Sequence, residues 1–403
     1  MALTINHQTN DISATSGSMT IDGSAVGGGG ADLYAANESS PTAQPSATGA
    51  NAIAIGDSAA ASGPDAFAIG QDTTASGNFA TALGSNGDGT GATASGNGSL
   101  AIHGSTASGS NSIAIGDSSV SSAVASIAIG GDTDATANYN IALGRGAQAL
   151  TNASAVAIGK SRASGSNSLA LNTDNNTSSY GAGGTDSIAI GKLAKTGSNT
   201  SAIAIGENAL ITGTGYRSIA IGNYAEAGPL FDAVALGSNT KASGNNSFAL
   251  GYHSVSTPYG KYAYASGKFN DSGDAQGGQY ILRADVTDTT VTTLTTDNST
   301  AAATNQIVAA ADTAIAFDGL VTVLQNGAQG WSAFKIQGLL VNDGGGPTYV
   351  AGSSVTAITN NSNFTLALSA DNTNKALSIK FTGYSNYTIR VVANVRTSEV
   401  TYA

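Results

Sequence analysis

Apolar and polar positions alternate along the middle of the chain in a short unit that recurs every 13–16 residues. One copy reads Ser112-Ile113-Ala114-Ile115-Gly116, followed by a polar turn, an Ala-Ser-Gly segment and a second polar turn. Large and small residues alternate with a period of two, which is typical of strands, and about 14 residues are too few for a helical hairpin. The pattern predicts two strands of four or five residues and two turns in each unit.

Fifteen such units predict a parallel β-roll over residues 50–267, in which each coil stacks on the one before it. Strands of successive coils would pair in parallel about 4.8 Å apart, giving a rod on the order of 70 Å long. Two intervals, 84–103 and 172–191, are 19 residues long, and we expect each to form a loop that bulges from a single coil.

The centre of the first strand is an alanine in every unit. These alanines are Ala54, Ala68, Ala82, Ala101, Ala114, Ala128, Ala142, Ala157, Ala170, Ala189, Ala204, Ala220, Ala235, Ala249 and Ala263. Alanine is a poor strand former, so a steric reason is needed, and we place these residues in the thin interior of the coil. The large flanking residues then face the other way and form an apolar ladder. A soluble monomer does not tolerate so large a patch, which predicts burial between subunits, with three-fold closure as the natural symmetry.

A glycine ends most of the first strands. Clear examples are Gly56, Gly70, Gly116, Gly130, Gly206 and Gly222. We expect this position to need a positive φ. His103 and Asn172 replace the glycine in two copies, and both residue types tolerate the left-handed region. Ala265 in the last copy does not fit, and we interpret it as the end of the roll.

The stretch Asn111-Ser112-Ile113-Ala114-Ile115-Gly116-Asp117-Ser118-Ser119 resembles the head repeat of trimeric autotransporter adhesins. The resemblance covers about residues 50–267 and implies a left-handed parallel β-roll in a homotrimer. The chain shows neither the signal peptide nor the C-terminal membrane-anchor barrel of that family. Similar head repeats occur in fibres of tailed bacteriophages. We therefore expect a phage fibre protein that is synthesised in the host cytoplasm and assembled into the virion.

The two ends of the chain differ from the roll. Residues 1–49 are polar and Gly-rich, and we interpret them as an attachment segment and linker that binds other virion proteins. Two apolar pieces there, Leu3–Ile5 and Met19–Ile21, are candidates to add a strand to a neighbour, and a disordered tail is the alternative for this segment. Residues 268–403 show longer alternating strands separated by Gly, Asn and Asp turns, which predicts an antiparallel, jelly-roll-like β-sandwich.

The composition of the chain limits the classes of function that we expect. The net charge is −11, and the first basic residue is Arg145, so we expect no nucleic-acid partner. There are no cysteines and no apolar run of membrane-spanning length, and the three histidines are scattered. We therefore expect no enzyme activity, catalytic residue, metal, cofactor or membrane insertion.

Four aromatic residues are candidates for receptor binding: Trp331, Tyr349, Tyr384 and Tyr387. Trp and Tyr often anchor interfaces, although core packing or contact between subunits is the interpretation that we favour. A second tyrosine cluster, at 252, 259, 262 and 264, is expected to pack the junction between roll and sandwich.

The function that we expect is a virion fibre, of tail or capsid, that attaches to a host-surface receptor, which would be a glycan or a protein. The alternatives are a purely structural spike, a tailspike glycanase and a bacterial trimeric surface adhesin.

Overall fold

The computed structural model describes residues 43–174, 177, 179–229, 231–327, 330–359, 363–385 and 387–402, together with four short strands near the N-terminus. Those four strands form two antiparallel hairpins. The first pairs β1 (Leu3–Asn6) with β2 (Asp11–Ala14), and the second pairs β3 (Met19–Ile21) with β4 (Ser24–Val26). Both apolar pieces are thus strands, each paired within its own hairpin. Most of the predicted linker, residues 27–42, lies outside the described residues.

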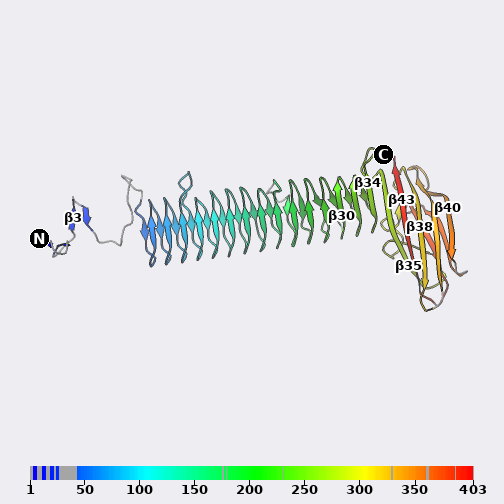
Figure 1. The fold of residues 1–403 in the computed structure, drawn as a ribbon, viewed down its shortest axis with the longest axis horizontal. Coiled ribbons are helices and arrows are strands. Elements are labelled where there is room, and N and C mark those ends of the chain that lie inside the picture. Colours follow the sequence, from blue (N-terminus) through cyan, green and yellow to red (C-terminus); the bar gives the residue numbers. More distant parts are fainter. Residues whose placement is uncertain are drawn as a thin grey trace.

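Residues 46–266 form a long parallel β-solenoid, which Figure 1 shows as a straight shaft. Each coil gives one strand to each of two sheets, which we name the ladder sheet and the back sheet. The ladder sheet contains β6 (Ile53–Ile55), β8 (Phe67–Ile69), β10 (Thr81–Leu83), β12 (Leu100–Ile102), β14 (Ile113–Ile115), β16 (Ile127–Ile129), β18 (Ile141–Leu143), β20 (Val156–Ile158), β22 (Leu169–Leu171), β24 (Ile188–Ile190), β26 (Ile203–Ile205), β28 (Ile219–Ile221), β30 (Val234–Ser238), β32 (Phe248–Tyr252) and β34 (Tyr262–Ser266).

The back sheet has fifteen strands of its own. They are β5 (Ser46–Ala47), β7 (Ala60–Ala61), β9 (Thr74–Ala75), β11 (Thr93–Ala94), β13 (Thr106–Ala107), β15 (Val120–Ser121), β17 (Asp134–Ala135), β19 (Gln148–Ala149), β21 (Arg162–Ala163), β23 (Gly181–Ala182), β25 (Lys195–Gly197), β27 (Leu210–Ile211), β29 (Glu226–Ala227), β31 (Lys241–Ala242) and β33 (Val255–Ser256). The predicted parallel roll of short coils is confirmed.

The alanine at the centre of each ladder-sheet strand lies in the interior of the coil, as predicted. The alanines stack in register from coil to coil, so that Ala128 pairs with Ala114 on one side and Ala142 on the other. All are fully buried except Ala54, whose coil is the first of the ladder sheet. Alanine, serine and threonine fill most of the remaining interior, for example Ala66, Ser112 and Thr133, because the two sheets lie too close together for larger side chains.

The position two residues after each interior alanine has a positive φ in every coil except the last, which confirms the prediction made for the glycine. Gly130 has a φ of 135°, and a Cβ there would lie 2.7 Å from the carbonyl carbon of Gly144 in the next coil. The two replacements keep the left-handed conformation, with φ values of 64° at His103 and 49° at Asn172. Ala265 lies instead within the extended strand β34.

Both long intervals insert residues at the same corner of the coil, between the ladder-sheet strand and the back-sheet strand. In the first, Ser85 and Gly91 form a β-bridge at the base of a loop, and the Asn86 side-chain oxygen accepts a hydrogen bond from the Thr90 N–H at 2.8 Å. The second interval contains three residues outside the described set. In Figure 1 the first of these loops projects from the upper edge of the shaft.

A β-sandwich follows the shaft and shares its ladder sheet. The last ladder-sheet strand, β34, pairs antiparallel with β35 (Ala275–Val286), and Tyr262 lies opposite Gln279. From β35 the antiparallel order runs through β43 (Ile389–Thr401), β38 (Thr313–Gln325), β39 (Trp331–Asn342) and β40 (Tyr349–Thr359). We name these five strands the large sheet.

A smaller antiparallel sheet packs on one face of the large sheet. Its central strand is β42 (Ala376–Thr382), with β41 (Thr365–Asp371) on one side and β36 (Thr292–Thr293) and β37 (Ile307–Val308) on the other. Side chains of both sheets form one core, in which Leu282 and Ile336 of the large sheet meet Ile379 and Phe381 of the small one. The predicted antiparallel sandwich is confirmed.

The jelly-roll topology is wrong. A jelly roll divides its strands between two sheets in two Greek keys. Here β38, β39 and β40 are neighbours in a single sheet, and the last strand, β43, is inserted between β35 and β38.

In the part of the chain that is described, no helix is long and apolar enough to cross a membrane.

Candidate functional site

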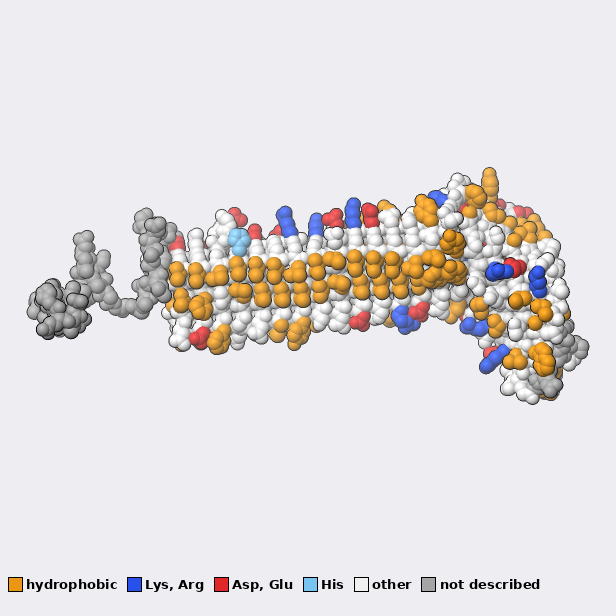
Figure 2. Space-filling model, viewed as in Figure 1, with side chains coloured by type: hydrophobic (Ala, Val, Ile, Leu, Met, Phe, Trp, Pro, Cys, Tyr) orange, Lys and Arg blue, Asp and Glu red, His pale blue; other side chains and the backbone are white. Residues whose placement is uncertain are grey.

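The outer side of the ladder sheet carries two rows of side chains, all apolar except Thr81. They are the residues on either side of each buried alanine, such as Ile127 and Ile129 beside Ala128. These side chains pack on their counterparts in neighbouring coils and stay partly exposed, with 39% of Ile69 and 38% of Ile129 accessible. Figure 2 shows both rows running along the whole shaft. We name this surface the apolar ladder.

The apolar ladder becomes aromatic where the shaft meets the sandwich. Phe248 stacks on Tyr262 with ring centroids 5.3 Å apart, and Tyr252 and Tyr264 remain about half exposed. The tyrosine cluster lies at the junction as expected, but strand alternation directs tyrosines 252, 262 and 264 to its outer face. The Tyr259 N–H donates to the carbonyl oxygen of Thr304 in the sandwich at 2.7 Å, and the Tyr259 hydroxyl accepts a hydrogen bond from the Asn246 side chain at 2.6 Å.

The same face continues onto the sandwich. Since paired residues of adjacent strands point the same way, the register from Tyr262 to Gln279 places the outer face of the large sheet in line with the apolar ladder. That face exposes large apolar side chains, namely Ile281, Leu320, Leu324, Trp331, Leu339, Val392 and Val400. Two ion pairs lie among them, Arg396–Asp318 at 2.7 Å and Arg390–Asp285 at 3.1 Å.

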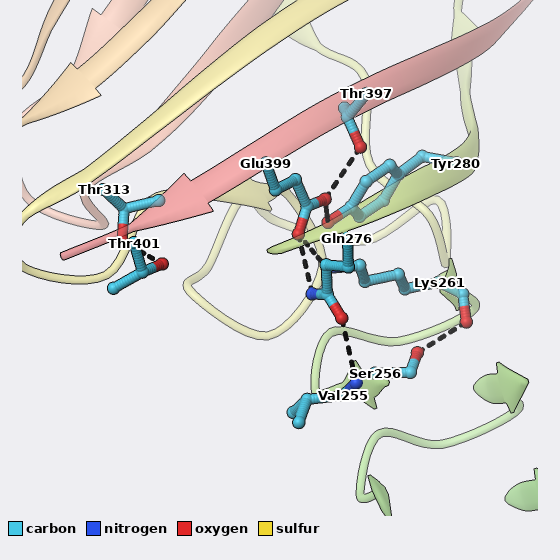
Figure 3. Close-up of polar contacts among 9 residues, drawn as sticks. All are labelled: Val255, Ser256, Lys261, Gln276, Tyr280, Thr313, Thr397, Glu399 and Thr401. Atoms are coloured by element: carbon cyan, nitrogen blue, oxygen red, sulfur yellow. Dashed lines mark hydrogen bonds and ion pairs between the residues drawn. The ribbon is translucent and has the colours of Figure 1, made fainter. Parts of the chain in front are cut away.

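A buried ion pair joins the shaft to the sandwich (Figure 3). The Lys261 ammonium lies 2.6 Å from a carboxylate oxygen of Glu399, and each side chain is only 6% exposed. Gln276 donates to the same oxygen at 2.8 Å, and Thr397 donates to the other at 2.7 Å. The Tyr280 ring lies 5.7 Å from the ammonium nitrogen. These contacts connect the last coil with β35 and β43 of the large sheet.

The electrostatics of the junction follow from burial. Burial raises the pKa of the Glu399 carboxyl, but the Lys261 charge and hydrogen bonds from Lys261, Thr397 and Gln276 outweigh it, so this pKa lies below its ordinary value. Burial, together with the Glu399 charge, raises the pKa of the Tyr280 hydroxyl well above its usual range. The Glu399 carboxyl is therefore ionised at neutral pH.

Sequence reasoning missed this junction, although a signal was present. Lys261 lies two residues before the last interior alanine, at a position that is Ala, Ser or Asn in every other coil. A long cation at a position that elsewhere points into the roll indicates a buried partner. The partner, Glu399, is 138 residues further along the chain, and no local pattern identifies it.

The four candidate receptor residues do not form one face. Trp331 begins β39 and Tyr349 lies opposite Val341 near its other end, so these two are about ten residues of strand apart. Tyr384 packs on the core, stacked on Phe364 at 5.7 Å, and meets the edge of Tyr387 at 5.3 Å. Trp331 and Tyr387 are 56% and 41% exposed. Their receptor role stays a prediction.

Within the described residues, no group of three or more His, Cys, Asp or Glu side chains is placed to hold a metal ion. The candidate sites that the described residues show are surfaces for contact: the apolar ladder, its continuation on the large sheet and the exposed aromatic side chains.

Comparison with known families identifies the repeat of the shaft. The model of the YadA head domain repeat (2 copies) matches residues 47–73, 61–86, 107–133 and 231–254. No curated protein matches the chain. Together with the parallel solenoid, the matches identify the shaft as a β-roll like that of trimeric autotransporter adhesins, and the chain as an adhesin-like repeat protein.

Proposed function

We propose that this chain forms a homotrimeric attachment fibre, with the solenoid as a rigid shaft and the sandwich as the contact domain. The observation that carries the proposal is the apolar ladder, a pair of apolar rows along one side of the shaft that Thr81 alone interrupts. Exposed apolar patches of this extent mark protein interfaces. Because every coil repeats the same surface, further copies of the chain are the simplest partner that covers its full length.

A three-fold arrangement is favoured by the head repeats, since proteins of the family that they resemble assemble as homotrimers. Cyclic closure would also turn all three apolar ladders toward one axis. The back sheets would then form the outside of the fibre.

Sedimentation equilibrium of the full chain tests the assembly. We expect a mass of three chains for the wild type. In an Ile115→Asp/Ile129→Asp variant the new charges would enter the interface, and we expect monomers. The matched control is Val120→Asp/Gln148→Asp, which adds the same charges on the outer side of the back sheet and should leave the trimer intact. A monomeric wild type would contradict the proposal.

Receptor attachment is proposed for the sandwich. At one end of the large sheet, Trp331 is exposed beside a hollow of ≈440 Å³ lined by Leu324, Gln325, Asn326, Gly327, Thr388 and Arg390. An aromatic ring beside polar groups and a cation is suited to a glycan. We expect the full chain to bind host cells and Trp331→Ala to weaken binding. Lys380→Ala, on the small sheet, is the control, and equal binding by all three proteins would argue against this site.

The setting that we propose is a phage virion, in which the N-terminal segment binds other virion proteins. A bacterial surface adhesin is the second candidate, and the match to the YadA head domain repeat favours it. Antibodies against the shaft would separate the two in electron micrographs. Labelled phage particles would support the virion, and labelled bacterial surfaces without labelled particles would support the adhesin.

We also propose that the protein acts by binding and has no enzymatic activity. A glycanase would need two carboxylates about 5–10 Å apart in a groove that binds the sugar chain. Incubation of the full chain with host surface polysaccharide should release no new reducing ends. Release that a single Asp or Glu substitution abolishes would overturn this part of the proposal.

A further inference from the structure

The back sheet presents one outward-facing side chain from each coil. In the middle of the shaft this row runs Gln148, Arg162, Gly181, Lys195 and Leu210. Gly181 lies opposite Lys195 in the register, and Arg162 lies in the preceding strand of the same row. The glycine therefore leaves one position of the row without a side chain, between two cations.

The gap is a consequence of the backbone conformation. Gly181 has a φ of 87°, and a Cβ there would collide with the carbonyl oxygen of Arg162. The register between β23 and β25 also shifts at Gly181 and Ala182, which is a β-bulge. Bulges and strand glycines often mark places where a ligand approaches the backbone closely. No other residue type fits this position without moving the chain.

A hollow of ≈500 Å³ lies over the gap. Its lining includes Arg162, Tyr180, Lys195 and Leu210, whose side chains are all partly exposed, and hydroxyl groups come from Ser164, Ser198 and Thr212. The volume falls within the range of about 300–1,000 Å³ that is typical of small-molecule sites. Because the back sheet faces away from the apolar ladder, the hollow stays open when the ladders meet in a trimer.

The two cations differ from most other basic residues of the shaft. Lys241, Lys192 and Arg145 each have a carboxylate partner, at 3.0, 3.7 and 3.9 Å, whereas Lys160, which does not line the hollow, has none among the described residues. In the described part of the chain, the side-chain hydrogen bond of Arg162 goes to Gln148, at 3.5 Å. Among the described residues, no carboxylate lies within 4.0 Å of Arg162 or Lys195. They lie two coil spacings apart, about 9.6 Å at 4.8 Å per strand, with the gap between them.

We propose that this hollow is a binding site for a carboxylate-bearing sugar. An anion placed over Gly181 would accept charge-assisted hydrogen bonds from Arg162 and Lys195. The hydroxyl groups of Ser164, Ser198 and Thr212 would meet those of the sugar. Tyr180 and Leu210 supply apolar surface for the face of a pyranose ring. The site lies within one chain, so it is independent of the trimer and of the receptor site proposed on the sandwich.

Isothermal titration calorimetry of the full chain tests the site, with D-glucuronate and N-acetylneuraminate as probes and D-glucose as the neutral comparison. We expect at least one of the acids to bind and glucose not to bind. Arg162→Gln and Lys195→Gln should each weaken binding at least about tenfold, since each removes one charge-assisted contact. Raising the NaCl concentration from about 0.01 to 0.15 M should also weaken it.

Lys241→Gln is the matched control, because it removes a cation from the same row at a position paired with Glu226 and away from the hollow. It should bind the acid as the wild type does. Three results would overturn the proposal: no binding of either acid, equal binding by Arg162→Gln and the wild type, or an equal loss in Lys241→Gln. If inorganic sulfate competes as well as the acids do at equal concentration, the hollow is a simple anion site and the assignment to a sugar is wrong.

Discussion

At the scale of single residues, the interior of the shaft allows almost no variation in size. The fifteen aligned alanines lie between sheets that leave room for a methyl group, and their neighbours in adjacent coils are also alanines. This explains why a poor strand former occupies the centre of every ladder-sheet strand. The outward neighbours vary among Ile, Leu, Val, Phe, Thr and Tyr because the coil itself does not confine them.

Replacing Ala128 with Leu should therefore destabilise the shaft. Ala128 is fully buried, and overpacking a well-packed core typically costs about 1–3 kcal/mol, so we expect a loss of at least that size. Thermal unfolding followed by circular dichroism measures it. Ala60→Leu makes the same change on the outer side of the back sheet and should be nearly neutral. If Ala128→Leu unfolds with the wild-type midpoint, the interior is wider than we infer.

The turn position gives a second test at this scale. Gly130→Ala places a Cβ 2.7 Å from the backbone of the next coil at a φ of 135°, which we expect to cost about 1–3 kcal/mol. His103→Gly, where φ is 64°, removes a side chain from a left-handed position and should be neutral or slightly stabilising. Chemical unfolding of both variants checks the difference, and equal effects would contradict the backbone explanation.

At the scale of elements, one buried ion pair lies at the junction between shaft and sandwich, beside the pairing of β34 with β35. Removing one partner of such a pair leaves an uncompensated charge and typically costs about 3–5 kcal/mol, whereas replacing both is often neutral. We expect Lys261→Met and Glu399→Leu each to destabilise the sandwich and the double variant to be more stable than either. Trp331 is the only tryptophan, so its fluorescence in chemical unfolding follows the sandwich. Additive losses in the double variant would show that the two side chains do not interact.

The same pair predicts an acid-dependent loss of stability. The Glu399 carboxyl has a lowered pKa in the folded protein, so it stabilises the fold above its unfolded pKa of about 4.5. This contribution is lost progressively as the pH falls below that value and through the folded pKa. We expect Glu399→Gln to be less stable than wild type at pH 7 and to show a smaller further loss between about pH 5 and pH 3. The measurement is the free energy of unfolding as a function of pH. Equal slopes for the two proteins between about pH 5 and pH 3 would contradict the assignment.

The strands of the sandwich were partly predictable. The alternation of apolar and polar residues that predicts strands over residues 268–403 is present in β35, β38, β39, β41, β42 and β43. The remaining long strand, β40, lacks this signal because Gly352, Ser353 and Ser354 interrupt its apolar pattern. The order of strands was wrong because the insertion of β43 between β35 and β38 depends on pairings such as Ala314 with Val400, 86 residues apart along the chain. No local signal encodes such a pairing.

At the scale of the whole molecule, the ladder sheet and the large sheet present one continuous outer face. If the apolar ladders of three chains meet at an axis, the outer face of the large sheet must also point toward that axis near the shaft. The small sheet and the back sheet lie on the opposite side. The assembly of the shaft thereby determines which side of the sandwich stays open to partners.

Cysteine cross-linking tests this arrangement without background, because the chain has no cysteine. Ser398→Cys places a thiol on the outer face of the large sheet beside the junction, and we expect disulfide-linked chains under oxidising conditions. Ala367→Cys places an exposed thiol on the small sheet and should give none. Non-reducing electrophoresis measures both. Cross-links in the Ala367 variant, with none in the Ser398 variant, would show that the sandwich faces the axis the other way.

The sequence by itself determined the shaft, because each coil satisfies its own steric requirements within about 14 residues and its pairing partner is always the next copy of the same pattern. The alanine, the positive-φ turn and the apolar ladder all follow from that local repetition. Only the tertiary structure decided the sandwich order, the Lys261–Glu399 pair and the hollow beside Gly181. The first two depend on residues that are far apart in the chain, and the third depends on a register shift between two coils.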